Sequence, residues 1–247
     1  MISSSPLNKK QVLHIRVMLI VFMLTGMCLS TLRTNAQQTT GSSGLLNIPV
    51  GDIYPDKTMS IGTNYLPEGQ AGERFNYNTA NYFFNLSFLP FIEATYRLTL
   101  LKVVRNNKRV TNQDRAFGVK WRLWKEKRIL PSIVAGMDDI YTSSGSGNQY
   151  FASSYVVSGK TINLHEHLIR FTAGYGFNPR DRNRLKGWFG GIDYSPRNLR
   201  SVSLMAEYDS WRINMATSVL LWKHLSVYAG CYGFDQPAAG ISYRFVL

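Results

Sequence analysis

One stretch of the sequence decides the fold: Asp114-Arg115-Ala116-Phe117-Gly118-Val119-Lys120-Trp121-Arg122-Leu123-Trp124. Side chains of a β-strand point alternately to its two faces. One alternating set in this stretch is apolar: Phe117, Val119, Trp121 and Leu123. The opposite set includes Gly118, Lys120 and Arg122. A soluble sandwich would bury the apolar face against a second sheet, whereas an outer-membrane barrel would turn it to lipid and point Lys120 and Arg122 into a polar lumen.

Residues 1–36 are predicted to be a cleaved signal peptide. Three basic residues precede the apolar run 17–29, and Thr34-Asn35-Ala36 supplies the small residues that a signal peptidase reads. A retained membrane anchor is the alternative, but the run is shorter than the roughly 20 residues that a spanning helix needs. Once the leader is removed, Cys231 is the one cysteine left, so no internal disulfide is expected.

The rest of this 247-residue chain is long enough for one large β domain or two small ones. Alternation with a period of two recurs along it, and no helical period competes. This criterion predicts about twelve strands: 59–65, 82–88, 94–100, 114–124, 133–137, 151–160, 169–175, 188–194, 202–209, 211–219, 225–229 and 241–247.

The links between these strands are of two kinds. Those that follow even-numbered strands are all short, whereas the first four that follow odd-numbered strands are longer: 67–80, 102–113, 141–148 and 177–186. Short turns on one rim, longer loops on the other, an even number of strands and aromatic residues at strand ends are typical of outer-membrane barrels. We therefore predict an all-β fold, a transmembrane outer-membrane antiparallel β-barrel of about twelve strands over residues 57–247, with the sandwich as the alternative.

Residues 37–56, between the signal peptide and the barrel, follow neither period. The first part, 37–43, is polar and rich in Gly and Ser, so it is predicted to be a flexible lead-in. The sequence leaves open whether the second part, 44–56, plugs the lumen.

No catalytic or metal-binding motif is convincing. His165 and His167 flank Glu166 in a predicted turn, but a His-x-His pair without a third ligand is a weak metal signal. Serines are plentiful, yet none stands in a recognisable nucleophile motif. We expect no catalytic residue, no metal, no cofactor and no enzymatic activity; an outer-membrane lipid or glycan hydrolase is the less favoured alternative.

Polar and charged side chains of both signs occupy the positions predicted to face the lumen. The charged candidates are Glu93, Arg97, Lys120, Arg122, Asp138, Lys160, Arg170, Asp193, Glu207, Asp209, Arg212 and Arg244. The favoured interpretation is a network of salt bridges that fills a narrow lumen, because unpaired buried charges are costly. The other interpretation is a polar path that contacts a charged glycan.

The longer predicted loops are basic. Their candidate residues are Arg105, Lys108, Arg109, Arg180, Arg182, Arg184 and Lys186. On an outer rim these side chains would attract phosphate or uronate groups of lipopolysaccharide or surface polysaccharide, although solvated loop charge is an equally good explanation. The net charge of +13 would also suit nucleic acid, but the predicted signal peptide excludes that partner.

Several motifs, spread in consistent order over the chain, resemble the YjbH/GfcD-type family of outer-membrane β-barrel proteins. They are Gly44-Leu45-Leu46-Asn47-Ile48-Pro49, Pro90-Phe91-Ile92-Glu93-Ala94, Asp114-Arg115-Ala116-Phe117-Gly118-Val119-Lys120, Leu130-Pro131-Ser132-Ile133-Val134-Ala135-Gly136, Tyr155-Val156-Val157-Ser158, Gly174-Tyr175-Gly176, Gly190-Gly191-Ile192 and Ala206-Glu207-Tyr208-Asp209. The chain departs from the long members of the family, because it has room for a single barrel only.

The resemblance implies a role in exopolysaccharide or capsule production, export or surface attachment, in the outer membrane of a Gram-negative bacterium. It also implies surface polysaccharide, outer-membrane lipid or lipopolysaccharide, and periplasmic or lipoprotein export components as partners. A structural or adhesive barrel that binds lipopolysaccharide or a partner through the basic loops is the alternative.

Overall fold

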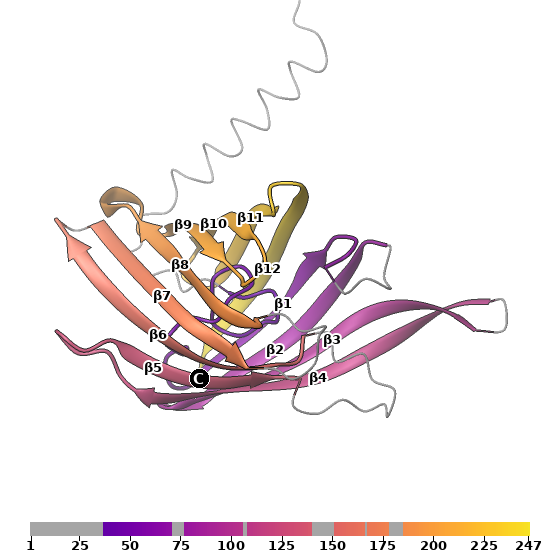
Figure 1. Cartoon of the computed structure of the whole chain (residues 1–247), viewed down its shortest axis with the longest axis horizontal. Coiled ribbons are helices and arrows are strands. Elements are labelled where there is room, and N and C mark those ends of the chain that lie inside the picture. Colours follow the sequence, from indigo (N-terminus) through magenta and orange to yellow (C-terminus); the bar gives the residue numbers. More distant parts are fainter. Residues whose placement is uncertain (1–36, 71–76, 106–107, 140–150, 166, 178–184) are drawn as a thin grey trace, which may run out of the picture.

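A computed structural model describes residues 37–70, 77–105, 108–139, 151–165, 167–177 and 185–247 (Figure 1). The predicted signal peptide, 1–36, lies outside these residues. Within the described part of the chain there are twelve β-strands and a single short 3-10 turn, η1 (Arg197–Leu199). The strands are β1 (Thr58–Leu66), β2 (Thr79–Leu89), β3 (Ile92–Arg105), β4 (Lys108–Trp124), β5 (Ser132–Asp138), β6 (Ser153–Leu164), β7 (His167–Phe177), β8 (Gly187–Ser195), β9 (Val202–Tyr208), β10 (Ile213–Leu221), β11 (Leu225–Tyr232) and β12 (Gln236–Val246).

The twelve strands form one closed antiparallel barrel, in which each strand pairs with its neighbours in the sequence. Closure is made by β1 and β12, which pair from Thr58↔Val246 to Tyr65↔Ala239. Closure leaves no unpaired sheet edge in the wall. The all-β barrel of about twelve strands predicted from the alternation is confirmed.

The two faces of β4 point as predicted from the sequence. The outward residues of β4 are Phe117, Val119, Trp121 and Leu123, which are 38–55% exposed. Lys120, between them, is 1% exposed and lies directly opposite Glu93 of β3 inside the barrel. The apolar face of β4 therefore forms part of the outer surface of the barrel, and its charged face points into the interior.

The facing predicted for β6 is wrong. Lys160 was predicted to face the lumen, so Tyr155 and Val157, which belong to the opposite alternating set, were predicted to point outward. Both are buried inside, and Val156 between them is 42% exposed. Tyr155 lies opposite Gly136 and Gly176, and a side chain at Gly136 would collide with its ring at 2.4 Å. Gly136 therefore makes room for the Tyr155 ring inside the barrel. Three apolar residues in succession carry no alternation, so the sequence could not fix the face.

The long loop predicted at 102–113 is also wrong. β3 continues to Arg105 and β4 starts at Lys108, and the two stay paired to Arg105↔Lys108. β-Branched residues in both extensions, such as Val103 and Val110, favour the extended conformation. The hairpin therefore reaches well beyond the neighbouring strands (Figure 1).

The barrel has two rims. We call the rim where β1 begins and β12 ends the terminal rim; the links that follow β2, β4, β6, β8 and β10 lie there. The opposite rim, which carries the links after the odd-numbered strands, is the distal rim. Apart from the β3–β4 hairpin, the longest links, such as that between Leu66 and Thr79, are on the distal rim.

Residues 37–54, which we call the inner segment, lie inside the barrel (indigo in Figure 1). Nearly all of this segment is buried, including the stretch 37–43 that was predicted to be a flexible lead-in. The main apolar core lies between the inner segment and the barrel wall, where Leu45 and Ile48 cluster with Val157 and Phe189. No helix among the described residues is long and apolar enough to cross a membrane.

Candidate functional site

The backbone of the inner segment is held by charged side chains of the barrel wall. Glu93 accepts hydrogen bonds from the backbone N–H of Ser43 at 2.7 Å and of Tyr54 at 3.0 Å, and from the Ser43 hydroxyl at 2.7 Å. Asn85 donates to the same carboxylate at 2.9 Å. Hydrogen bonds to an ionised acceptor are stronger than neutral ones, so Glu93 fixes both ends of the stretch 43–54.

Glu207 binds the turn at the tip of the inner segment in the same way. Its two oxygens accept from the successive backbone N–H groups of Leu46 (2.9 Å), Asn47 (2.8 Å) and Ile48 (3.3 Å). Asn214 donates to it at 2.9 Å. Successive backbone N–H groups that converge on one anion form a nest, here filled by a wall carboxylate.

Lys120 supplies the complementary contact to backbone carbonyls. Its Nζ donates to the carbonyl oxygens of Ser43 (2.7 Å), Val50 (3.3 Å) and Asp52 (2.8 Å), and to the Ser43 hydroxyl at 2.6 Å. Three barrel charges thus satisfy backbone groups that would otherwise be buried without partners.

Direct ion pairs between side chains are a smaller part of the contacts that the interior charges make. Arg97 pairs with Asp139 at 2.7 Å and with Asp114 at 3.8 Å, and its guanidinium lies 3.9 Å from the ring centre of Phe151. Arg170 pairs with Asp193 at 3.7 Å. The predicted salt-bridge network is therefore present only in part. Asp139 was not predicted to face the lumen, although it directly follows Asp138, which was.

Lys160 was predicted to face the lumen and does not. It lies on the outward set of β6, because its neighbours Val157 and Gly159 point inward. Its Nζ donates to the carbonyl oxygens of Lys127 (2.6 Å) and Arg128 (2.9 Å), and lies 3.3 Å from Glu126. It stabilises the β4–β5 link on the outside.

The other predicted lumen residues lie inside the barrel or at its ends. Asp138 is buried at the end of β5. Asp209 accepts from the amide of Asn47 at 2.9 Å, and Arg212 lies over the ring of Tyr232 at 5.6 Å.

The predicted basic loop residues are spread over three settings. Arg105, Lys108 and Arg109 lie on the extended β3–β4 hairpin. Lys186 is exposed just before β8. Arg180, Arg182 and Arg184 lie outside the described residues.

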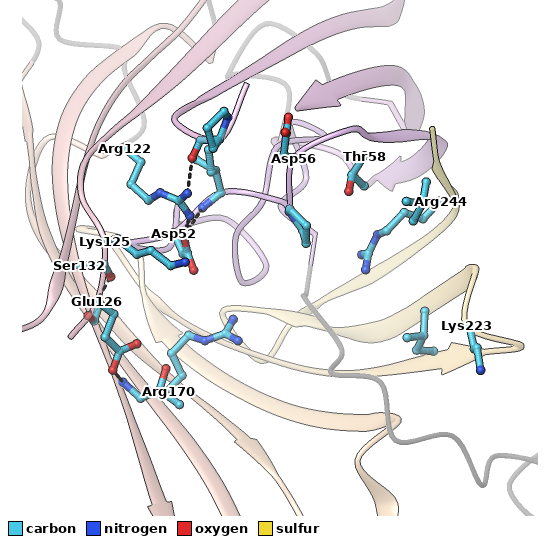
Figure 2. A pocket seen from close by; sticks show the side chains of 18 residues that line it. Asp52, Asp56, Thr58, Arg122, Lys125, Glu126, Ser132, Arg170, Lys223 and Arg244 are labelled. Atoms are coloured by element: carbon cyan, nitrogen blue, oxygen red, sulfur yellow. Dashed lines mark hydrogen bonds and ion pairs between the residues drawn. The ribbon is translucent and has the colours of Figure 1, made fainter. Parts of the chain in front are cut away.

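A cavity of about 670 Å³ opens on the terminal rim, beside the point where the inner segment leaves the barrel (Figure 2). We call it the rim cavity. Its lining includes the predicted lumen residues Arg122, Arg170 and Arg244. It also includes Lys125 and Lys223, which were not among the predicted site residues. Both lie in links that follow even-numbered strands. Because all of these links lie on the same rim, the sequence could have indicated that Lys125 and Lys223 belong to one site.

The acids of the rim cavity already have partners. Asp52 pairs with Arg122 at 2.8 Å, and Asp56 accepts from the backbone N–H of Lys57 at 2.9 Å. Glu126 accepts from the backbone N–H of Thr161 at 2.8 Å and is the partner of Lys160.

The guanidinium groups of Arg170 and Arg244 point into the cavity from opposite walls (Figure 2). Arg244 also lies over the ring of Tyr54, 4.5 Å from its centre. Burial raises the pKa of Tyr54 to about 12, against the opposing charge of Arg244, so this ring stays neutral beneath the guanidinium. The arrangement can bind anions. Among the described residues, no group of three His, Cys, Asp or Glu side chains could hold a metal ion.

The fold and the site thus define a closed antiparallel barrel with an apolar outer surface, an interior filled by its own chain and a basic cavity at one rim. Residues 36–181 match the family described as "Exopolysaccharide biosynthesis protein YbjH", and the chain belongs to this family. The resemblance drawn from the sequence motifs is therefore confirmed.

A curated relative is the "Uncharacterized lipoprotein YjbH" of Escherichia coli (strain K12), which is 28% identical over 147 residues. The match covers 57% of this chain and 19% of the relative, so the chain spans about one fifth of that protein's length. Among solved structures, outer membrane phospholipase A from Escherichia coli matches with a TM-score of 0.39 and 13% identity, over 81% of this chain and 99% of that one.

Proposed function

We propose that this protein is an outer-membrane β-barrel of a Gram-negative bacterium that assists exopolysaccharide or capsule production, export or surface attachment without catalysing a reaction. The observation that carries the proposal is the apolar outer surface of a closed barrel, in a chain that belongs to an exopolysaccharide biosynthesis family. A barrel is the form in which β-strands can cross a bilayer with every backbone group paired.

The outer surface supports a membrane location. Large apolar side chains are exposed around the barrel wall, including Phe171 of β7, Leu204 of β9 and Ile241 of β12. Exposed aromatic residues lie near both rims: Trp188, Tyr208 and Trp211 near the distal rim, and Trp222 and Tyr243 near the terminal rim. Aromatic side chains at both ends of an apolar band are typical of the two membrane interfaces.

A binding role is supported by what the interior charges do. Glu93, Glu207 and Lys120 are each engaged by several groups of the inner segment, so these buried ionisable residues serve to hold the chain in place. Three other residues predicted to face the lumen, Arg122, Arg170 and Arg244, line the rim cavity instead. We therefore expect a ligand to bind at this rim.

The orientation follows from the two rims. In bacterial outer-membrane barrels the short turns face the periplasm and the longer loops face outward. We therefore place the terminal rim and the rim cavity toward the periplasm, where lipoprotein or periplasmic export components and the nascent polysaccharide would meet it. The distal rim, with the extended β3–β4 hairpin and Lys186, would face lipopolysaccharide.

Cell fractionation and gene deletion test this proposal together. The full-length protein is expected in the outer-membrane fraction of its native bacterium, and deletion of its gene is expected to reduce cell-surface or secreted exopolysaccharide. Re-expression of the intact gene should restore the polymer. Recovery of the protein in the soluble fraction, or an unchanged amount of polymer in the deletion strain, would contradict the proposal.

A further inference from the structure

The rim cavity has more cationic than anionic side chains in its lining. The cations are Arg122, Lys125, Arg170, Lys223 and Arg244, and the acids are Asp52, Asp56 and Glu126. We propose that this cavity binds the carboxylate or phosphate groups of an anionic glycan chain. The proposal rests on the proposed function and names the ligand class for the site at the terminal rim.

Two of the cations have no ionic partner in the described part of the chain. Lys125 and Lys223 are exposed, and neither takes part in any of its ion pairs. The three acids, by contrast, are engaged by Arg122, by Lys160 and by backbone N–H groups. The cavity therefore has an uncompensated positive charge that attracts anions at its mouth.

The arginines supply directed contacts as well as charge. Arg170 is largely buried, with a side chain 12% exposed, and Asp193 holds it from behind at 3.7 Å. The guanidinium of Arg244 lies over the ring of Tyr54, 4.5 Å from its centre. A guanidinium presents a rigid fork of N–H donors that matches carboxylate and phosphate oxygens. Two such forks from opposite walls, as in Figure 2, fit a ligand with more than one anionic group.

The position of the cavity favours a glycan over a membrane lipid. Its walls are inward-facing residues of the barrel, such as Ser132, Gly159 and Leu220. A lipid head group would have to leave the bilayer and enter the barrel mouth to reach them. A polymer that arrives from the periplasm meets the mouth directly. The apolar lining from Ile53, Pro55 and Leu220 offers contacts for sugar ring faces, in a volume usual for ligand sites.

The turn that carries Lys223 is strained. Trp222 and Lys223 both have positive φ, at 47° and 68°, in the three-residue turn between β10 and β11. Residues other than Gly, Asn and Asp rarely adopt this conformation, and such strain persists mainly at functional sites. The strained turn places Lys223 on the cavity wall.

The test uses the full-length protein in nanodiscs of zwitterionic lipid, with oligogalacturonate as the probe and a neutral galactose oligomer of equal length as the comparison. The charged oligomer should bind at least tenfold more tightly, and added salt should weaken its binding. The variant K125Q/K223Q should weaken that binding about tenfold, as two lost charge contacts predict. The matched control K127Q/R128Q removes the same charge from the same rim outside the cavity, and should change binding less than twofold.

Each other outcome overturns the inference. Equal effects of the two double variants would mean non-specific attraction to the rim. Equal binding of the neutral oligomer would remove the role of charge, and no binding by the wild-type protein would remove the site. Loss of binding when phosphatidylglycerol is added to the nanodisc would identify a lipid head group as the occupant. None of these results bears on the gene-deletion phenotype, which tests the proposed function separately.

Discussion

The inner segment and the rim cavity use the same types of charged side chain in opposite ways. Around the inner segment, Glu93, Glu207 and Lys120 are buried and each contacts several backbone groups. At the rim cavity, Lys125 and Lys223 are exposed and take part in none of the ion pairs of the described residues. The charge of a barrel interior therefore does not by itself indicate a path for a ligand, because a folded segment of the same chain can use it. Substitutions in the two regions should differ in their effect on stability.

Lys120→Met should have the largest effect. The change leaves the carbonyl oxygens of Ser43, Val50 and Asp52 without their common donor. Removal of one partner from a buried charged contact costs about 3–5 kcal/mol. Urea unfolding of the refolded protein in detergent should show a loss of this size. Lys160→Met, outside the barrel, is the control and should cost less than about 1 kcal/mol. Equal losses of stability in the two variants would contradict a special role of Lys120 in holding the inner segment.

Glu207→Gln should have the next largest effect. The two carboxylate oxygens together accept from the backbone N–H groups of residues 46–48, and one of them would be replaced by an amide NH2 group that can only donate. Buried donors left without an acceptor predict a loss of about 2–3 kcal/mol. The same unfolding measurement checks it, together with faster proteolysis near Leu46. An unchanged stability would mean that the turn does not depend on this carboxylate.

Gly51→Ala should displace the inner segment without removing any charge. A Cβ at this position would lie 2.2 Å from the backbone nitrogen of Gly159, which cannot move without disturbing β6. Overpacking of this kind costs about 1–3 kcal/mol. Hydrogen exchange should increase in the inner segment and in β6 but not in β10. Unchanged exchange in the inner segment and in β6 would show that Gly51 and Gly159 are not in contact.

The ion pair of Arg122 with Asp52 should have the smallest effect. The pair is at the rim, and the Asp52 side chain is 53% exposed. Exposed ion pairs contribute about 0.2–1 kcal/mol. A double-mutant cycle with Arg122→Gln and Asp52→Asn should give a coupling energy in this range that decreases with salt. A coupling energy as large as the stability loss in Lys120→Met would mean that the ion pair at the rim contributes as much to stability as the contacts of the interior.

The barrel wall was predictable because alternation is a local signal. In β4 the apolar and charged residues separate cleanly between the two faces, so both the strand and its facing follow from the sequence. In β6 the run Tyr155-Val156-Val157 is apolar on both faces, and the space at Gly136 of the neighbouring strand β5 lets the Tyr155 ring point inward. Facing in that strand is a property of the packed barrel.

The interior arrangement was not predictable for a different reason. Residues 37–54 have no strand or helix period, and their partners are distant in the sequence, as with Leu46 and Glu207. Glu93, Lys120 and Glu207 were predicted to face inward, but they were expected to pair with other charges. The rim cavity depends on the same three-dimensional information, because Lys125 and Lys223 line one cavity only after the barrel has closed.

The most direct measurement is amide hydrogen exchange of the inner segment in the purified full-length protein. The backbone N–H groups of Ser43, Leu46 and Asn47 donate to buried carboxylates, so we predict exchange as slow as that of the strand amides of β4 and β9. In Lys120→Met the exchange of these three amides should become faster together. Exchange at the rate of an unstructured chain in the wild-type protein, while the strands stay protected, would contradict the central claim that the barrel charges hold the inner segment inside.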